Sequence, residues 1–378
     1  MGDAAEFQYK EQGVSRRTFI KRGIASGASV SAASYVFRQG TTVSAQVPGS
    51  VDMPAFELFQ PTSTQTAVGL LGRYGADAWV LAGGLDTWDW LKDRVKRPAA
   101  VVDLGEIDAL KAIRSSDGGL LIGAMATLRD VVRHEQVRSQ YLLLAQAAEF
   151  AASPQIRNQG TIGGNIGQDT RCWYYRDGWN CYRAGGNICY ADTPTAMNRE
   201  HCILGASRCV AVNPSDTAPA LIALDAEMVV VSAQGERVVR ATDFFVGPDI
   251  DIERMTVLQP GDLLTEIWIP PTWADARFYF EKCRDRAVSD FPLANVASAA
   301  RISGGVIEDI RVAVNGVAPT PLRLTAVEDA VRGEPVNEQT ASRAGAVAVR
   351  GAKPLAHNAY KISLLRNLVK RAIRGTEA

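Results

Sequence analysis

The residues best able to do chemistry in this sequence are its cysteines, because five of the six lie within 38 consecutive residues. They are Cys172, Cys181, Cys189, Cys202 and Cys209, while Cys283 stands apart. Four cysteine thiolates can hold one [4Fe–4S] cluster. The spacing contains no Cys-x-x-Cys of a ferredoxin run or zinc ribbon, so disulfides and buried free thiols remain alternatives. Disulfides would leave one cysteine of the segment unpaired, and five free thiols would be unusually crowded; Cys283 is predicted to be a free thiol without a redox role.

Two glycine-rich loops could bind an anion. Gly83-Gly84 follows a predicted strand, and Gly163-Gly164 follows a long predicted helix, with Thr161 and Asn165 beside it. Glycine lets backbone N–H groups approach a phosphate closely, and Thr and Asn side chains add donors. Taken alone, each loop is explained equally well as a tight turn. The sequence has no Gly-x-Gly-x-x-Gly after a strand and no Gly-Lys-Ser/Thr, so a Rossmann fold and a P-loop are not supported.

Hydrophobic periodicity and turn signals predict the elements that must position these loops. A strand at 79–81, a helix at 87–94 and a strand at 99–104 form a β-turn-α-β unit. Further helices are expected at 66–74, 128–133 (capped by Thr127), 141–152 and 217–224, and further strands at 120–124, 228–232, 236–240 and 263–269. The strands at 228–232 and 236–240 form a hairpin. Residues 156–167 are predicted to be a shaped loop, and residues 169–209 show no periodicity.

Pro270-Pro271 predicts a boundary between two domains. Beyond it, predicted strands at 295–302 and 308–314 precede three helices, near 323–331, 338–350 and 358–374. Strands followed by helices are typical of an α+β domain. We therefore expect one domain over residues 46–271, with the cysteine segment 169–209 inserted in it, and a C-terminal domain over residues 272–378.

Seven motifs occur in order along this framework. They are Val80 to Gly84, Val102 to Leu104, Gly123 to Thr127, Ser153 to Asn165, Pro214 to Asp216, Asp243 to Phe245 and Leu263 to Ile267. Together they resemble the FAD-binding subunit of the molybdenum hydroxylases, the xanthine dehydrogenase and carbon monoxide dehydrogenase family. The resemblance implies an α+β fold: a PCMH-type domain of two subdomains with FAD extended between them, and a C-terminal α/β domain like that of the carbon monoxide dehydrogenase flavoprotein.

The same resemblance implies the residues that bind FAD. The first pyrophosphate loop comprises Val80, Leu81, Ala82, Gly83, Gly84, Leu85, Asp86 and Thr87, the second comprises Thr161, Ile162, Gly163, Gly164 and Asn165, and Asp216, Leu264 and Lys282 lie near the ribityl chain, the isoalloxazine and the flavin edge. Relatives often carry a small or polar residue directly after Gly-Gly, so Leu85-Asp86 is a departure that leaves the contacts of the first loop open. Taken alone, Asp216 is equally well a helix N-cap, and Lys282 a solvated surface lysine.

The cysteine segment carries a second, narrower resemblance. The segment is similar to an insertion in the flavin subunits of 4-hydroxybenzoyl-CoA reductase and periplasmic aldehyde oxidoreductases. The similarity lies in the short motifs around Cys172, Cys181, Gly185-Gly186, Cys189 and His201. That insertion carries a [4Fe–4S] cluster. The ligands implied here are Cys172, Cys181, Cys189 and Cys209, with Cys209 favoured over Cys202 as the fourth.

The function implied is electron transfer. In this family a large subunit with a molybdenum cofactor hydroxylates a substrate, and a small subunit with two [2Fe–2S] clusters relays electrons to FAD. We therefore predict an oxidoreductase subunit with FAD and [4Fe–4S], and we name no catalytic acid or base. Two rival hypotheses are a self-contained flavin oxidase and an exported binding or scaffold subunit whose cysteines form disulfides.

The first 45 residues predict export. Ser15-Arg16-Arg17 precedes Phe19-Ile20-Lys21, then a weakly apolar run and small residues ending at Ala45, a pattern that resembles a twin-arginine signal. The apolar run falls short of the ~20 residues that span a bilayer. We expect cleavage after Ala45 and a periplasmic location. The chain has 41 basic and 41 acidic residues, and the signal holds six and three of them, so the remainder carries a net charge of −3, which argues against nucleic-acid binding.

Overall fold

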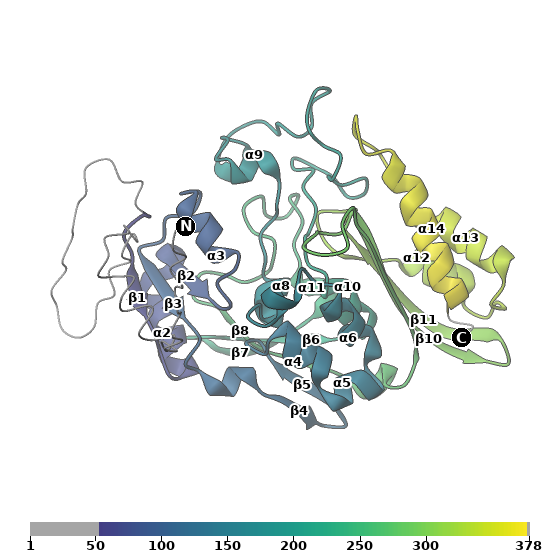
Figure 1. Cartoon of the computed structure of the whole chain (residues 1–378), viewed down its shortest axis with the longest axis horizontal. Coiled ribbons are helices and arrows are strands. Elements are labelled where there is room, and N and C mark those ends of the chain that lie inside the picture. Colours follow the sequence, from purple (N-terminus) through teal and green to yellow (C-terminus); the bar gives the residue numbers. More distant parts are fainter. Residues whose placement is uncertain (1–52, 376–378) are drawn as a thin grey trace, which may run out of the picture. The chain divides into compact units, whose positions relative to one another are not determined.

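The computed structural model describes residues 53–375. The predicted export signal and its cleavage site lie outside these residues. Within them, no helix combines the length and the apolar character that a membrane crossing requires. The described chain forms three sheets, each with its own helices, and Figure 1 shows them following one another along the sequence.

The first sheet is parallel and three-stranded, in the order β1 (Glu57–Phe59), β3 (Ala100–Asp103), β2 (Ala78–Leu81). Helix α2 (Thr64–Tyr74) precedes β2, and α3 (Thr87–Lys92) joins β2 to β3, so the predicted β-turn-α-β unit is confirmed. Helix α2 begins two residues earlier than predicted, since the Ser63 side chain accepts the Thr66 N–H and caps it.

The second sheet is antiparallel and five-stranded, in the order β4-β5-β8-β6-β7. Its strands are β4 (Ile113–Ser116), β5 (Gly119–Gly123), β6 (Glu227–Ser232), β7 (Gly235–Arg240) and β8 (Leu263–Ile269). The predicted β6–β7 hairpin and β8 are confirmed, whereas β4 was missed because its residues are at most half-buried. Leu120, Ile122 and Ile267 point into the largest hydrophobic core.

Short helices cover this core. They are α4 (Leu128–Arg133), α5 (Glu135–Gln140), α6 (Leu142–Glu149), α7 (Pro154–Arg157), α8 (Ile162–Ile166), α10 (Ala218–Ala223) and α11 (Ala241–Phe244). Thr127 and Asp130 form a reciprocal capping box that starts α4, as predicted for Thr127. The prediction of a loop over 156–167 was wrong, because Thr161 accepts the Gly164 N–H and nucleates α8 despite its glycines.

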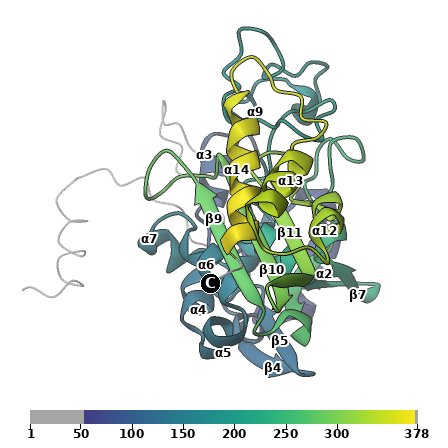
Figure 2. The same ribbon diagram turned by 90° about the vertical axis from the view of Figure 1, so that its right-hand side faces the viewer.

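The C-terminal sheet is antiparallel, in the order β12-β11-β10-β9. Its strands are β9 (Arg277–Cys283), β10 (Ala294–Ser303), β11 (Val306–Asn315) and β12 (Leu322–Arg323), and its helices are α12 (Thr325–Val331), α13 (Glu338–Ala348) and α14 (Tyr360–Arg374). Figure 2 shows the three helices beside the sheet, the predicted α+β arrangement. Strand β9 was not predicted from the sequence. The helix predicted from residue 323 starts later, at Thr325, because Leu322 and Arg323 pair with β11.

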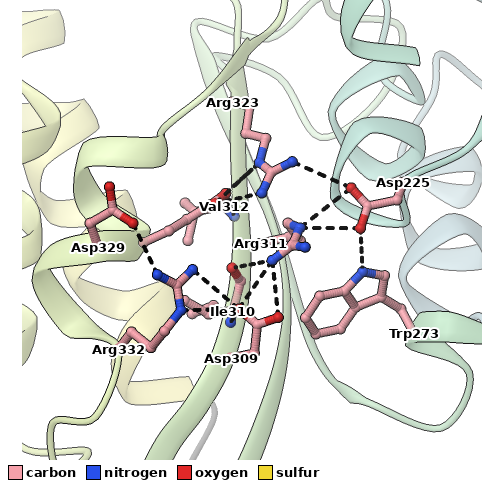
Figure 3. Close-up of polar contacts among 10 residues, drawn as sticks. Asp225, Trp273, Asp309, Ile310, Arg311, Val312, Arg323, Asp329 and Arg332 are labelled. Atoms are coloured by element: carbon pink, nitrogen blue, oxygen red, sulfur yellow. Dashed lines mark hydrogen bonds and ion pairs between the residues drawn. The ribbon is translucent and has the colours of Figure 1, made fainter. Parts of the chain in front are cut away.

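A polar network joins this C-terminal sheet to the preceding domain (Figure 3). Asp225, just after α10, accepts hydrogen bonds from Trp273 Nε1 at 2.7 Å and Arg311 Nε at 3.1 Å, and lies 3.5 Å from Arg323 Nη1. Alanines of β10 and β11 enter the same core as α6 and α10. The C-terminal sheet is therefore packed against helices α6 and α10 through small side chains and anchored by charge at its margin.

The cysteine segment, residues 169–209, lacks strands and contains one four-residue α-helix, α9 (Trp173–Arg176), and one turn of 3-10 helix, η3 (Tyr182–Ala184). Its lack of periodicity thus reflects irregular backbone. Polar contacts with the start of α14 hold one end of it: Asn358 Nδ2 donates to the carbonyls of His201 and Cys202, both at 3.0 Å, and Lys361 Nζ donates to the Glu200 carbonyl at 2.7 Å. The C-terminal domain therefore supports the segment that carries the cysteines.

Candidate flavin and cysteine sites

A cavity of about 470 Å³ is lined by both the first and the second subdomain. Thirteen of the sixteen predicted FAD-binding residues line it: Val80, Ala82, Gly83, Gly84, Leu85, Asp86, Thr87, Thr161, Gly163, Gly164, Asn165, Asp216 and Leu264. Leu81 and Ile162 instead point into hydrophobic clusters. Lys282 does not line the cavity but contacts Asp216, which does. The two glycine loops, whose Gly83 and Gly163 are 80 residues apart in the chain, therefore share one cavity.

The glycines are needed because the loops pack closely. A Cβ at Gly83 would lie 2.4 Å from the Gln159 carbonyl oxygen, and one at Gly163 would lie 2.7 Å from that of Ala124. Gln159 Nε2 also donates to the Gly83 carbonyl at 2.7 Å. The first loop thus rests directly on the residues that lead into the second. This close approach leaves a glycine-lined cradle that a side chain would fill.

The polar side chains of the second loop act mainly within the protein. Thr161 Oγ1 accepts the Gly164 N–H at 3.0 Å. Asn165 Oδ1 accepts hydrogen bonds from the hydroxyls of Ser215 and Thr217, each at 2.7 Å. These bonds join the second loop to the segment that carries Asp216. The bonds to Asn165 use its acceptor Oδ1 and not its donor Nδ2, so the prediction that Thr161 and Asn165 add donors to an anion stays a prediction.

Asp216 and Lys282 form a buried ion pair, with Oδ2 and Nζ 2.7 Å apart. Lys282 Nζ also donates to the Phe150 carbonyl at 3.1 Å. Burial raises the pKa of Asp216 and lowers that of Lys282, while each partner opposes the shift of the other. The two alternatives, a surface lysine for Lys282 and a helix N-cap for Asp216, are therefore both wrong. Lys282 is buried, and the N-cap of α10 is Thr217. Lys282 itself does not line the cavity but pairs with Asp216, which does, and its place near the flavin edge stays a prediction.

Asp216 also presents a free acceptor. Its Oδ1 is buried and has no hydrogen-bond partner in the described part of the chain, while Asp216 itself lines the cavity. A buried carboxylate oxygen without a donor is costly, and a hydroxyl of a bound ligand would satisfy it. The cavity thus combines a glycine cradle suited to a diphosphate with an acceptor suited to a ribityl hydroxyl. The residues present fit FAD.

A second, much smaller cavity, of about 10 Å³, lies in the cysteine segment. Cys172, Cys181, Cys189 and Cys209 all line it, together with Tyr175 and Arg183, whereas Cys202 does not. Cys202 is buried beside Ala191 and Val210. The four cysteines that share this cavity are those predicted as ligands.

The thiols are not assembled as a metal site. Among the described residues, no group of three or more His, Cys, Asp or Glu side chains has a metal-binding arrangement, and the six cysteines are free. Burial raises the pKa of Cys172 to about 12. His201 Nε2 lies 3.3 Å from Cys172 Sγ. A bound cation would be required to hold the Cys172 sulfur as a thiolate at neutral pH.

Comparison with known proteins decides the family. The family described as the FAD binding domain in molybdopterin dehydrogenase matches residues 54–272. The chain belongs to the FAD-binding flavoprotein subunits of the molybdenum hydroxylases. The CO dehydrogenase flavoprotein C-terminal domain matches residues 278–376 of this flavoprotein.

Relatives of the flavoprotein match it over nearly their whole length. The aldehyde oxidoreductase FAD-binding subunit PaoB of Escherichia coli is 31% identical over 330 residues, 86% of this chain and 99% of that protein. The carbon monoxide dehydrogenase medium chain of Hydrogenophaga pseudoflava is 30% identical over 330 residues, 86% and 98% of the two chains. A solved structure of carbon monoxide dehydrogenase from that organism superposes with a TM-score of 0.69 at 30% identity, covering 86% of this chain and 98% of that one.

The predicted fold, the FAD cofactor and the oxidoreductase class of the flavoprotein are thereby confirmed. The roles assigned to individual residues stay predictions. The sequence missed that Arg171 and Phe291 also line the large cavity. Arg171 stands next to Cys172 in the cysteine segment, and no glycine or phosphate-binding pattern marks it. Only the folded chain brings it to the flavin cavity.

Proposed function

We propose that this flavoprotein is the FAD- and [4Fe–4S]-containing electron-transfer subunit of an exported molybdenum hydroxylase. It takes electrons from [2Fe–2S] clusters of a partner subunit and passes them to an external acceptor. The observation that carries the cluster assignment is the small cavity lined by Cys172, Cys181, Cys189 and Cys209. Four thiolates around one cavity are the ligand set of a [4Fe–4S] cluster.

The surroundings of the four cysteines favour Cys209 over Cys202 as the fourth ligand. Cys202 is about 1% exposed and does not line the cavity. Arg183, itself a lining residue and 4% exposed, lies against Cys209 and brings a positive charge to the side of the cavity where Cys209 stands. The side chain of Arg183 also donates to the Glu253 carbonyl at 2.9 Å, which fixes its position.

The residues of the chain hold and orient the cofactor. FAD exchanges electrons one or two at a time, so it can join one-electron carriers to a two-electron acceptor. The glycine loops would hold its diphosphate and Asp216 Oδ1 would accept a hydroxyl of its ribityl chain. Lys282 keeps the Asp216 carboxylate charged and in place, and Leu264 supplies an apolar wall.

The partners we propose are a large molybdenum-cofactor subunit and a small [2Fe–2S] subunit. The names of two relatives support a multisubunit assembly, since one is a FAD-binding subunit and another a medium chain. Export through the twin-arginine pathway is compatible with cofactors inserted before transport. For a periplasmic enzyme we propose oxygen, a quinone or a cytochrome as the electron acceptor rather than NAD.

Purification of the native complex from the periplasm tests the proposal. We expect one FAD and four irons on this chain, flavin bands with a broad iron–sulfur shoulder, two co-purifying subunits and an N-terminus after Ala45. Flavin bands without iron would remove the cluster from the proposal and support a simpler flavoprotein. Rapid flavin reduction by NADH would contradict the proposed acceptor, and Met1 on the exported chain would refute the cleavage.

A further inference from the structure

The wall of the flavin cavity is acidic. Six aspartates line it: Asp86, Asp89, Asp169, Asp216, Asp262 and Asp290. Among the described lining residues, Arg171 is the one arginine or lysine. The diphosphate of FAD is anionic and would be repelled by uncompensated carboxylates. The balance of charge in this cavity therefore depends on how each aspartate is paired and on Arg171.

Five of these aspartates have cationic partners. Four of them pair with basic side chains that do not line the cavity. Asp169 lies 3.4 Å from Arg183 and 3.6 Å from Lys96, and Asp216 lies 2.7 Å from Lys282. Asp262 lies 2.9 Å from Arg237, and Asp290 lies 2.6 Å from Arg286. Asp86 is different, because it belongs to the first glycine loop, its two cationic partners come from the cysteine segment, and one of them also lines the cavity. They are Arg171 and Arg176.

The contacts of Asp86 leave Arg171 with donors to spare. Arg176 Nη2 donates to Asp86 Oδ1 at 2.7 Å, and Trp90 Nε1 donates to Oδ2 at 3.1 Å, so both carboxylate oxygens are satisfied without Arg171. The Arg176 guanidinium also stacks over the Trp90 ring, 3.4 Å from its centroid. Arg171 uses Nη1 on Asp86, and its guanidinium lies 4.6 Å from the centroid of Phe291. Within residues 53–375 its other N–H groups make no hydrogen bond, which leaves them for a ligand in the cavity that Arg171 lines.

We propose that Arg171 is a binding residue for the anionic diphosphate of FAD, contributed by the cysteine segment and positioned by Asp86. The proposal rests on the binding of FAD by this chain and adds to it a cation that the glycine loops lack. Guanidinium groups bind phosphate oxygens through paired N–H donors, which an ammonium does less well. The departure Leu85-Asp86 in the first loop then has a role: Asp86 holds an arginine from the inserted segment at the cavity.

The test is FAD affinity of the full chain, measured by flavin fluorescence during reconstitution of deflavinated protein. Arg171→Gln should weaken FAD binding about tenfold or more at low salt, and Arg171→Lys should recover part of that loss. The difference from the wild type should shrink in high salt, because screening weakens a charge contribution that is partly exposed. Arg240→Gln, which removes an exposed arginine paired with Asp243 elsewhere, is the matched control and should leave the affinity unchanged.

Unchanged FAD affinity in Arg171→Gln would overturn the proposal. An equal loss at every salt concentration would also overturn it, because a structural defect is not screened. Iron content is measured on the same preparations, so that the role of Arg171 and the assignment of the cluster are tested separately. The FAD affinities of the variants test the role of Arg171 whether or not iron is present. Failure of the wild-type chain to bind FAD would instead contradict the family function itself.

Discussion

The flavin cavity and the cysteine segment are built by different means. The flavin loops follow regular elements, β2 and the helices before α8, and glycines let them pack against each other at Gly83 and Gln159. The cysteine segment has almost no regular structure, and side-chain contacts with α3 and the start of α14 hold it. The flavin loops are therefore fixed by close backbone packing, which a single side chain at Gly83 would disturb. The cysteine segment is fixed by separate side-chain contacts, so loss of one of them should act locally.

The largest expected effect concerns the cysteine segment. Cys209→Ser should abolish iron binding, because a [4Fe–4S] cluster needs four ligands and serine replaces one thiolate. Cys202→Ser is the matched control and should keep its iron, since Cys202 does not line the small cavity. Iron and acid-labile sulfide analysis, with the visible spectrum, measures both. Iron retained in Cys209→Ser and lost in Cys202→Ser would reverse the assignment.

The next effect concerns the wall of the flavin cavity. Lys282→Met should destabilise the protein by about 3–5 kcal/mol, because it leaves Asp216 buried without its cation. The double variant with Asp216→Asn should recover much of that loss. Urea unfolding measures each variant.

The loss in Lys282→Met should depend on pH. Burial raises the folded-state pKa of Asp216 above its unfolded value, and removal of Lys282 raises it further. Stability from protonated Asp216 is present at acidic pH and lost as pH rises through the folded pKa. The variant should therefore be closer to the wild type at acidic pH than at pH 8. An equal deficit at both would show that the ion pair is not the cause.

A third change sharpens the comparison at the glycine loops. Gly83→Val should cost about 3 kcal/mol in the FAD-bound form, since its Cβ would lie 2.4 Å from the Gln159 carbonyl oxygen. That corresponds to roughly a hundredfold loss of FAD affinity. Gly69→Ala in α2 is the control: its Cβ meets no atom within 4 Å, and it should stabilise the helix by about 0.5–1 kcal/mol. Tight FAD binding by Gly83→Val would mean that the loop can move.

The smallest effect distinguishes the support of the cysteine segment from that of the core. Asn358→Ala should cost about 2 kcal/mol, because it removes donors from the carbonyls of His201 and Cys202. We expect faster proteolysis within residues 198–203 while FAD stays bound. Cleavage elsewhere, or loss of FAD, would show that the C-terminal contact supports the whole domain rather than this segment.

Most elements of the fold were predictable because their signals are local. Hydrophobic period, the Thr127 cap and the turn after Ser232 each depend on neighbours in the chain. The missed strands β4 and β9 lie at sheet edges with mixed burial, where pairing with a distant strand decides the structure. Helix α8 was missed because glycine has low helix propensity, and the Thr161 cap with surrounding packing overrides it.

The sequence by itself determined the family, the cofactor and the two sets of candidate residues, because motif order and cysteine spacing are properties of the chain. Only the tertiary structure decided which side chains share a cavity. It paired Asp216 with Lys282, which does not line the flavin cavity, and it brought Arg171 to that cavity. It also left Cys202 out of the small cavity that the other four cysteines of the segment line. Most of these contacts join residues that are tens of positions apart in the chain. They depend on burial and on the pairing of charges, which no local sequence pattern shows.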